Sequence, residues 1–385
     1  MIFSAFSGIW DLATGIFEAP FMKQRFIILV LCAVLLPLSA HAGYGPEIQA
    51  DLEARGMEGQ KMIFARDYPK ALEIFGKLVE EYPSHPIGYF GKMAVLEMKM
   101  LERNSFHLGQ EFEATAKLGH KAMLKTRNRQ PTDWDLLVCG SLLGLEGFYW
   151  ARRKEWWDAY SLGVKSRQTF KRIKKRNREF YDADFGLGMY LYWRSVFTKS
   201  ISFLKMFPDK RAEGIAIVKQ VVEKGKFARE LAEVNLGMMW MEEKKYGESA
   251  RIFGKYAKRY PKNVLIHMYN GRSLIGAKKF DAAVNEFETM IKLDPQLKKG
   301  HYFIGVARVL QRDKKHYGQA EHELKFYLPS APKGEWKGAT YYWLGRLEEQ
   351  RGNKAKAVAY YEDALKQNPN LKKLKFRIRG IGSGL

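Results

Sequence analysis

Apolar positions recur along this chain with the spacing of amphipathic α-helices. In residues 280–293, for example, Phe287 and Met290 lie three positions apart and therefore share one face of a helix. Proline closes several of these stretches, because it lacks an N–H and its ring clashes with the preceding turn. No alternating strand pattern of any length occurs. The sequence therefore predicts an all-α protein.

The helical pattern of the C-terminal half repeats at a fixed interval. Gly237, Gly271 and Gly305 are 34 residues apart, and Pro261 and Pro295 keep the same spacing. Four consecutive units share these offsets, with three extra residues inside the third. Small residues allow two antiparallel helices to approach closely, and large ones fill the space to the next hairpin. The recurring small residues are Ser249, Ala283, Ala320 and Ala357, and the recurring large ones are Phe253, Phe287, Leu324 and Tyr361.

This spacing resembles the tetratricopeptide repeat, whose pattern runs W-x2-L-G-x2-Y, then A-x3-F, then P. In the first unit, Leu236, Gly237 and Trp240 precede Pro261. The resemblance is specific over residues 230–371 and looser upstream. It implies a right-handed α-solenoid of tetratricopeptide-like helical hairpins, seven or eight over residues 44–373. Such repeats bury a core by stacking and present a long concave surface for binding.

The same patterns divide the chain into four expected segments. A solenoid grows as one array, because each hairpin contacts only its neighbours. The segments are an N-terminal extension and signal peptide (1–42), divergent helical-hairpin repeats (43–229), four regular tetratricopeptide repeats (230–371) and a basic C-terminal tail (372–385).

The N-terminal segment has the features of a secretory signal peptide. Lys23 and Arg25 precede an apolar run over residues 26–38, and Ala40 and Ala42 take the small-residue positions of a cleavage site. We expect cleavage after Ala42 and export to the periplasm or cell envelope, with translation beginning at Met22. The alternative is an uncleaved N-terminal anchor.

The formal net charge is +23, and removal of the leader does not change it. Such an excess favours acidic partners. Because a signal peptide directs the protein to export, we do not expect nucleic acid as its ligand. We expect an acidic protein or an anionic membrane surface instead. A solvated helix face is the alternative for the densest run. A second run, over residues 372–379, fits either a solubilising cap or a membrane contact. The predicted basic patch of the densest run comprises Lys171, Arg172, Lys174, Lys175, Arg176 and Arg178.

In a tetratricopeptide array, the first helix of each hairpin lines the concave groove. The resemblance therefore implies two inner rows, three residues before and one residue after each repeat glycine. The Lys and Asn residues that grip a chain terminus in one subset of the family are missing here. Ordinary surface ion pairs are the alternative for the two arginines. The predicted groove residues are Val234, Met268, Tyr302 and Tyr342 in one row, and Met238, Arg272, Val306 and Arg346 in the other.

No catalytic, metal-binding or cofactor-binding motif is found in the sequence, and we predict no enzyme activity, metal or cofactor. Asp182 and Asp184 precede an apolar helix, so we interpret them as caps of its free N–H groups. Cys139, in an apolar helix, is interpreted as a buried, inert thiol. Catalysis from residues 104–209 is the alternative. A carbohydrate-stacking or lipid-facing role is the alternative to solenoid core, which is our interpretation of the aromatic residues Trp150, Trp156, Trp157, Tyr190, Tyr192 and Trp193.

Together these observations predict a non-enzymatic scaffold or adaptor of the cell envelope. Its concave groove would bind a peptide segment or partner protein of acidic character. A basic protein that binds membrane surfaces or anionic glycans is the alternative function.

Overall fold

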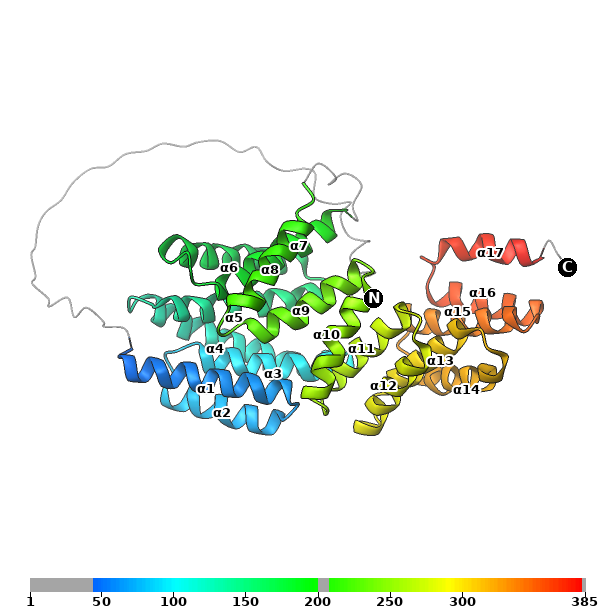
Figure 1. Cartoon of the computed structure of the whole chain (residues 1–385), viewed down its shortest axis with the longest axis horizontal. Helices are drawn as coiled ribbons and strands as arrows, with labels where there is room; N and C mark the ends of the chain where they lie inside the picture. The colour runs from blue at the N-terminus through cyan, green and yellow to red at the C-terminus, as the bar shows by residue number, and fades with distance from the viewer. Residues whose placement is uncertain (1–43, 200–207, 383–385) are drawn as a thin grey trace, which may run out of the picture. The chain divides into compact units, whose positions relative to one another are not determined.

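A computed structural model describes residues 44–199 and 208–382. The predicted signal peptide lies outside these residues. Among the residues described, every regular element is a helix (Figure 1). The all-α prediction is confirmed.

The chain divides into two compact units. Of the described residues, the first comprises 44–63, 67–100, 106–199 and 208–232, and the second comprises 64–66, 101–105 and 233–382. The helices that begin in the first unit are α1 (Pro46–Phe64), α2 (Tyr68–Glu81), α3 (Ile87–Arg103), α4 (Gly109–Arg127), α5 (Asp133–Arg152), α6 (Trp156–Arg176), α7 (Asp182–Lys199), α8 (Arg211–Lys224) and α9 (Arg229–Glu242).

Consecutive helices of the first unit pair as hairpins through close contacts at glycine. A Cβ atom added at Gly59 of α1 would lie 2.4 Å from the Phe75 ring of α2. One added at Gly188 of α7 would lie 3.0 Å from the carbonyl oxygen of Gly214 in α8. The weak repeat signals upstream of residue 230 thus correspond to real hairpins. Residues 104–130, which do not fit the repeat pattern, contain α4, and α3 packs against it through a shared buried cluster.

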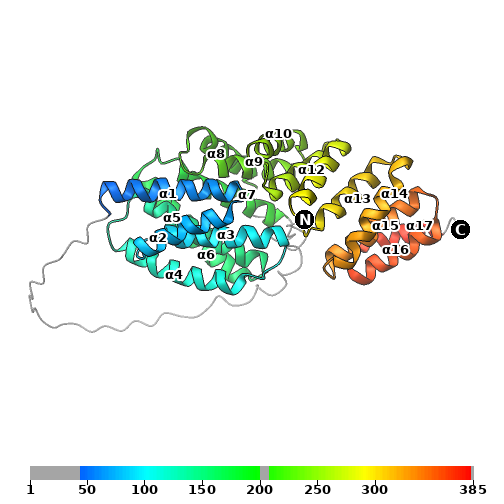
Figure 2. The same cartoon turned by 90° about the horizontal axis from the view of Figure 1, so that it is seen from below.

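The second unit consists of regular hairpins (Figure 2). Two short 3-10 turns, Lys314–His316 and Leu328–Ser330, interrupt it. The first of them accommodates extra residues of the third unit. The α-helices are α10 (Tyr246–Arg259), α11 (Val264–Gly276), α12 (Phe280–Leu293), α13 (Lys299–Gln311), α14 (Tyr317–Tyr327), α15 (Glu335–Gln350), α16 (Lys354–Gln367) and α17 (Lys372–Gly382).

The repeat glycines of the second unit receive the large side chains that the sequence pairs with them. A Cβ atom at each glycine would lie 2.5–3.1 Å from the nearest atom of that side chain. A side chain at any of these positions would force the two helices apart, which explains the 34-residue glycine period. The pairs are Gly237 with Phe253, Gly271 with Phe287, Gly305 with Leu324, and Gly345 with Tyr361.

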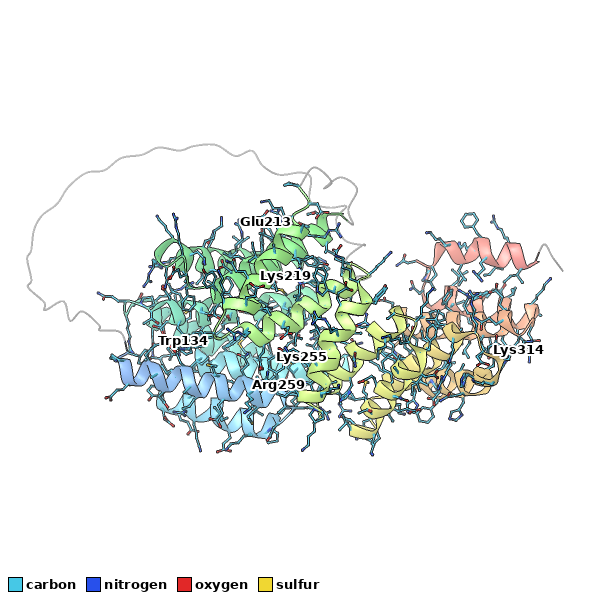
Figure 3. The ribbon with its side chains drawn as sticks, viewed as in Figure 1. Trp134, Glu213, Lys219, Lys255, Arg259 and Lys314 are labelled. Carbon is cyan, nitrogen blue, oxygen red and sulfur yellow. The ribbon has the colours of Figure 1, made fainter. Side chains whose placement is uncertain are left out.

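Each unit has a buried apolar core of its own. In the first unit, Trp134 of α5 (labelled in Figure 3) is buried and stacks on the imidazole of His85, with 5.4 Å between ring centroids. The Nε2 atom of His85 lies 3.0 Å from a carboxylate oxygen of Asp135, which is also buried. Aromatic stacking and a hydrogen-bonded pair therefore fix the N-terminal end of α5 in the core.

The turns inside the hairpins share one backbone feature. A residue in the left-handed region separates the two helices of seven hairpins in the described residues, and six of these seven residues are not glycine. This conformation costs an L-residue roughly 1–2 kcal/mol. The residues are Arg66, Asn104, Lys154, Lys244, Lys278, Arg312 and Gly352.

Replacement of Lys278 by glycine is therefore expected to stabilise the protein by about 0.5–1 kcal/mol. Lys278 is exposed and has φ 59°, so the substitution removes backbone strain and little packing. The reverse change, Gly352→Ala at φ 82°, is the matched control and is expected to destabilise by about 1 kcal/mol. Urea unfolding of both variants checks this, and a loss of stability in Lys278→Gly contradicts it.

The C-terminal basic segment, expected as a tail over residues 372–385, forms a helix over its described residues. Residues Gly380–Gly382 end α17, and Leu374 on its inner face is 5% exposed. It packs in the same buried cluster as Ala357 and Tyr361 of α16. The apolar residues that alternate with the basic ones provide this inner face, so α17 caps the last hairpin.

Candidate functional site

The predicted groove residues lie on the first helices of the four C-terminal hairpins, α9, α11, α13 and α15. Within each helix the two predicted positions are four residues apart and so lie on one face. The six that are partly exposed remain candidates for contact with a partner. They are Val234, Met238, Met268, Arg272, Tyr342 and Arg346.

The other two predicted groove residues are buried, and the structure corrects their assignment. Tyr302 is 1% exposed and Val306 is 7% exposed. Trp336, from the start of α15, lies against the Tyr302 ring with 5.4 Å between centroids. Burial also raises the pKa of the Tyr302 hydroxyl far above its ordinary value. Both residues belong to the core of the third hairpin, so the groove is interrupted at α13.

The two groove arginines differ in their surroundings. Arg272 has neither an ion pair nor a hydrogen bond within the described part of the chain, and its guanidinium lies 5.8 Å from the centroid of the Tyr269 ring. Arg346 donates a hydrogen bond to the Tyr342 hydroxyl (3.1 Å) and lies 3.8 Å from a Glu349 oxygen. The ion-pair alternative therefore applies to Arg346 and not to Arg272.

Arg346 also lines a polar pocket of about 270 Å³. Three guanidinium groups and one carboxylate line this pocket, which leaves an excess of two positive charges. Guanidinium groups bind carboxylates and phosphates with paired hydrogen bonds. The residues of this arginine pocket are Arg312, Tyr317, Arg346, Glu349, Gln350 and Arg377.

Glu349 is the internal partner of these arginines. Arg377 of α17 donates two hydrogen bonds to its carboxylate, at 2.8 and 2.7 Å. Burial opposes ionisation of Glu349, but the hydrogen bonds from Arg377 and Tyr361 outweigh it and lower the pKa of this carboxyl. Glu349 therefore holds α17 in place through Arg377 and neutralises one of the three guanidinium charges, so that a net charge of plus two remains for an anion. Sequence reasoning missed Arg312 and Arg377, because one lies in a turn and the other in the expected tail.

The predicted basic patch lies at the end of α6 in the first unit. Within the described part of the chain, two of its six residues have acidic partners and four do not. Lys174 forms an ion pair with Asp184 (2.7 Å), and Arg176 lies 3.5 Å from Asp133. The other four are exposed, and none of their side chains has an ion pair or hydrogen bond among residues 44–199 and 208–382; the backbone carbonyl of Arg178 accepts a hydrogen bond from the Lys174 ammonium group. The four are Lys171, Arg172, Lys175 and Arg178.

Asp182 acts as a cap, but for a different segment from the one predicted. It is the first residue of α7, and its carboxylate accepts hydrogen bonds from the backbone N–H groups of Lys226, Phe227 and Ala228, at 2.7–3.1 Å. These groups directly precede α9. Asp184 instead pairs with Lys174. Neither carboxylate is therefore placed as a free acid or base.

The aromatic residues predicted as core are only partly buried. Tyr192 is fully buried, whereas Trp157 on α6 is 73% exposed. The structure therefore corrects Trp157, because it lies on the outer face of the second helix of its hairpin. Cys139 is buried, and burial raises the pKa of its thiol to about 12, which makes it unreactive.

In the described residues no group of three or more His, Cys, Asp or Glu side chains is placed to hold a metal ion. Within the same residues, none of the helices has the length and apolarity needed to span a bilayer.

Comparison with known proteins agrees with the repeat pattern. Residues 338–371 match the tetratricopeptide repeat family. No curated protein sequence matches the chain. The chain resembles the solved Cut9–Hcn1 hetero-tetramer of the APC/C, with a TM-score of 0.54, 13% identity and coverage of 84% of this chain. It spans 54% of that chain, about half of its length.

Two other solved structures have lower TM-scores. A tetratricopeptide repeat protein from Parabacteroides merdae has 9% identity and a TM-score of 0.42, covering 74% of this chain and 98% of its own. Yeast Tom70 has 12% identity and a TM-score of 0.42, covering 83% and 76%. The helical hairpins, the repeat match and the likeness to Cut9–Hcn1 agree with one another. The chain therefore has the fold of a tetratricopeptide-repeat protein, with a repeat of that family at residues 338–371.

Proposed function

We propose that this protein is a non-enzymatic scaffold of the cell envelope that binds an acidic peptide segment in the second unit. The arginine pocket supports this proposal most directly, since it adds a net charge of plus two to the end of the predicted groove. Tetratricopeptide arrays generally bind protein partners on such surfaces. Export through the predicted leader would place the partner among envelope proteins.

The groove and the pocket have complementary roles in this proposal. The partly exposed apolar residues Val234, Met238 and Met268 would contact apolar side chains of the segment. A carboxylate of the segment would then enter the arginine pocket, where Arg346 is held by the Tyr342 hydroxyl. Arg272, which has no internal acidic partner in the described residues, provides a second anion contact. A few such anchors provide most of the binding energy.

The test is the double variant Arg272→Glu with Arg346→Glu. We expect the affinity for an acidic envelope peptide to fall by about a hundredfold or more, because the variant removes two charged contacts and charged hydrogen bonds contribute about 1.5–3 kcal/mol each. Thermal stability is expected to stay unchanged. Fluorescence polarisation with a labelled acidic peptide, and with its amidated analogue, measures the loss.

The matched control is Arg251→Glu with Lys262→Glu, which makes the same charge change in the second unit. Arg251 lies on α10 and Lys262 just beyond it, and both are exposed and outside the predicted rows. The control is expected to keep binding within about twofold. Equal affinity of the double variant and the unchanged protein would contradict the groove proposal, and equal losses in both variants would show a non-specific charge effect.

A further inference from the structure

The outer face of α6 combines exposed aromatic residues with uncompensated cations. Trp157 and Tyr160 near its N-terminus are 73% and 62% exposed. Lys171, Arg172 and Lys175 near its C-terminus are exposed as well. Spacings of three, four, eleven and eighteen residues, each close to a whole number of helical turns, place all five on one side of the helix. At 1.5 Å per residue, this face is about 27 Å long.

The charge of this face is not neutralised by its own chain. No acidic residue occurs between Asp158 and Glu179, whereas that interval contains eight lysines and arginines. Lys174 and Arg176, on the flank, have acidic partners. Within the described residues, Lys171, Arg172 and Lys175 have none. The outer face therefore keeps three solvent-exposed positive charges within little more than one helical turn.

We propose that the outer face of α6 binds an anionic lipid surface, with the helix axis parallel to that surface. The cations would lie among the lipid phosphates, and the rings of Trp157 and Tyr160 would enter the interfacial layer. Tryptophan and tyrosine favour this layer because each combines an apolar ring with a polar group. Lysines and arginines near an anionic leaflet add electrostatic attraction.

The arrangement of the face distinguishes a lipid surface from other anionic ligands. The cations begin about 16 Å along the helix from Tyr160, whereas single-stranded nucleic acids need aromatic and basic groups side by side, since each base has its own phosphate. An acidic peptide needs a groove or a sheet edge to bury its side chains, and a single outward helix face offers neither. A lipid surface is continuous and contacts both ends at once. The inference is independent of the groove in the second unit.

A fluorescent dye attached at position 157 measures directly whether α6 contacts the lipid surface. In the full chain, Trp157→Cys is combined with Cys32→Ser and labelled with an environment-sensitive fluorophore. Cys139 does not compete, since it is buried and burial raises the pKa of its thiol to about 12. The probes are vesicles of phosphatidylcholine, with and without phosphatidylglycerol. A blue shift with the anionic vesicles alone is expected, and it should disappear near 1 M salt, where the screening length is about 3 Å.

Two controls separate α6 from the rest of the chain. A dye at Leu124→Cys, a 58% exposed position on α4, is expected to show no shift. Replacement of Lys171, Arg172 and Lys175 by glutamine is expected to weaken vesicle partitioning about a hundredfold. The matched variant replaces three exposed lysines on other helices of the first unit, Lys61, Lys121 and Lys125, and is expected to have a much smaller effect.

Three outcomes would overturn the inference. The first is that the fluorescence of the dye at position 157 does not change with anionic vesicles. The second is an equal spectral shift of the dye at position 124. The third is an equal loss of vesicle partitioning in the two triple variants. Binding of an acidic protein or an oligonucleotide without binding of vesicles would assign this face to that ligand instead.

Discussion

Replacement of Asp182 by alanine is expected to lower the free energy of unfolding by about 3–5 kcal/mol. Asp182 is 4% exposed, and its carboxylate accepts hydrogen bonds from the N–H groups of Lys226, Phe227 and Ala228. Alanine would leave three donors without an acceptor, of which the N–H of Ala228 is buried and those of Lys226 and Phe227 are partly buried. Each unsatisfied buried donor costs about 1–3 kcal/mol. The loss therefore exceeds that of an ordinary surface ion pair.

Chemical denaturation together with amide hydrogen exchange checks this prediction. Exchange at Phe227 and Ala228 should accelerate most, since their N–H groups lose the acceptor directly. Asp184→Asn is the control, because that carboxylate pairs with one partner, Lys174, and should cost only about 1 kcal/mol. Asp182→Asn keeps one acceptor oxygen and should have an intermediate effect. Equal stabilities of the alanine variant and the unchanged protein would show that the three hydrogen bonds add little to stability.

The repeat pattern predicted the hairpins well, because it reflects a local packing rule. A glycine on the first helix and a large residue on the second are 16 residues apart in three of the four units, and both helices lie between two turns. Gly271 with Phe287 and Gly345 with Tyr361 form the predicted contacts. The match is weaker upstream, where Gly188 instead meets the backbone of Gly214.

Features that depend on contacts distant in sequence were not predictable in this way. Asp182 binds backbone groups 44 to 46 residues further along the chain. Trp336 of the next hairpin covers Tyr302, a contact that the repeat offsets do not contain. The arginine pocket combines a turn residue, Arg312, with Arg377 of α17. None of these pairings follows from a helical period.

Exposure on the second helices was also difficult to predict from the sequence. Trp157 and Tyr160 are spaced like core residues, but Leu162 and Phe170 form the buried side of α6. An aromatic residue that faces solvent has the same helical periodicity as one that faces the core. Only the neighbouring helices decide which side of α6 is covered.

Replacement of Gly271 by alanine is expected to destabilise the protein by about 1–3 kcal/mol, even though alanine is the better helix former. The added Cβ atom would lie 2.5 Å from the Phe287 ring. That ring cannot move away easily, since Phe287 is fully buried and stacks on Phe303 with 5.0 Å between centroids. The strain must therefore separate α11 from α12. The midpoint and slope of urea unfolding, with hydrogen exchange in both helices, measure the effect.

Gly254 of α10 provides the matched control for this substitution. A Cβ atom there would meet its nearest neighbour, the Asn270 amide, at 3.8 Å, which is an ordinary contact. Gly254→Ala is therefore expected to stabilise the protein by about 0.5–1 kcal/mol, the gain from replacing glycine inside a helix. The same substitution thus has opposite signs at the two glycines. If both variants lost stability equally, close packing at Gly271 would not explain the 34-residue period, because Gly254 has no such contact.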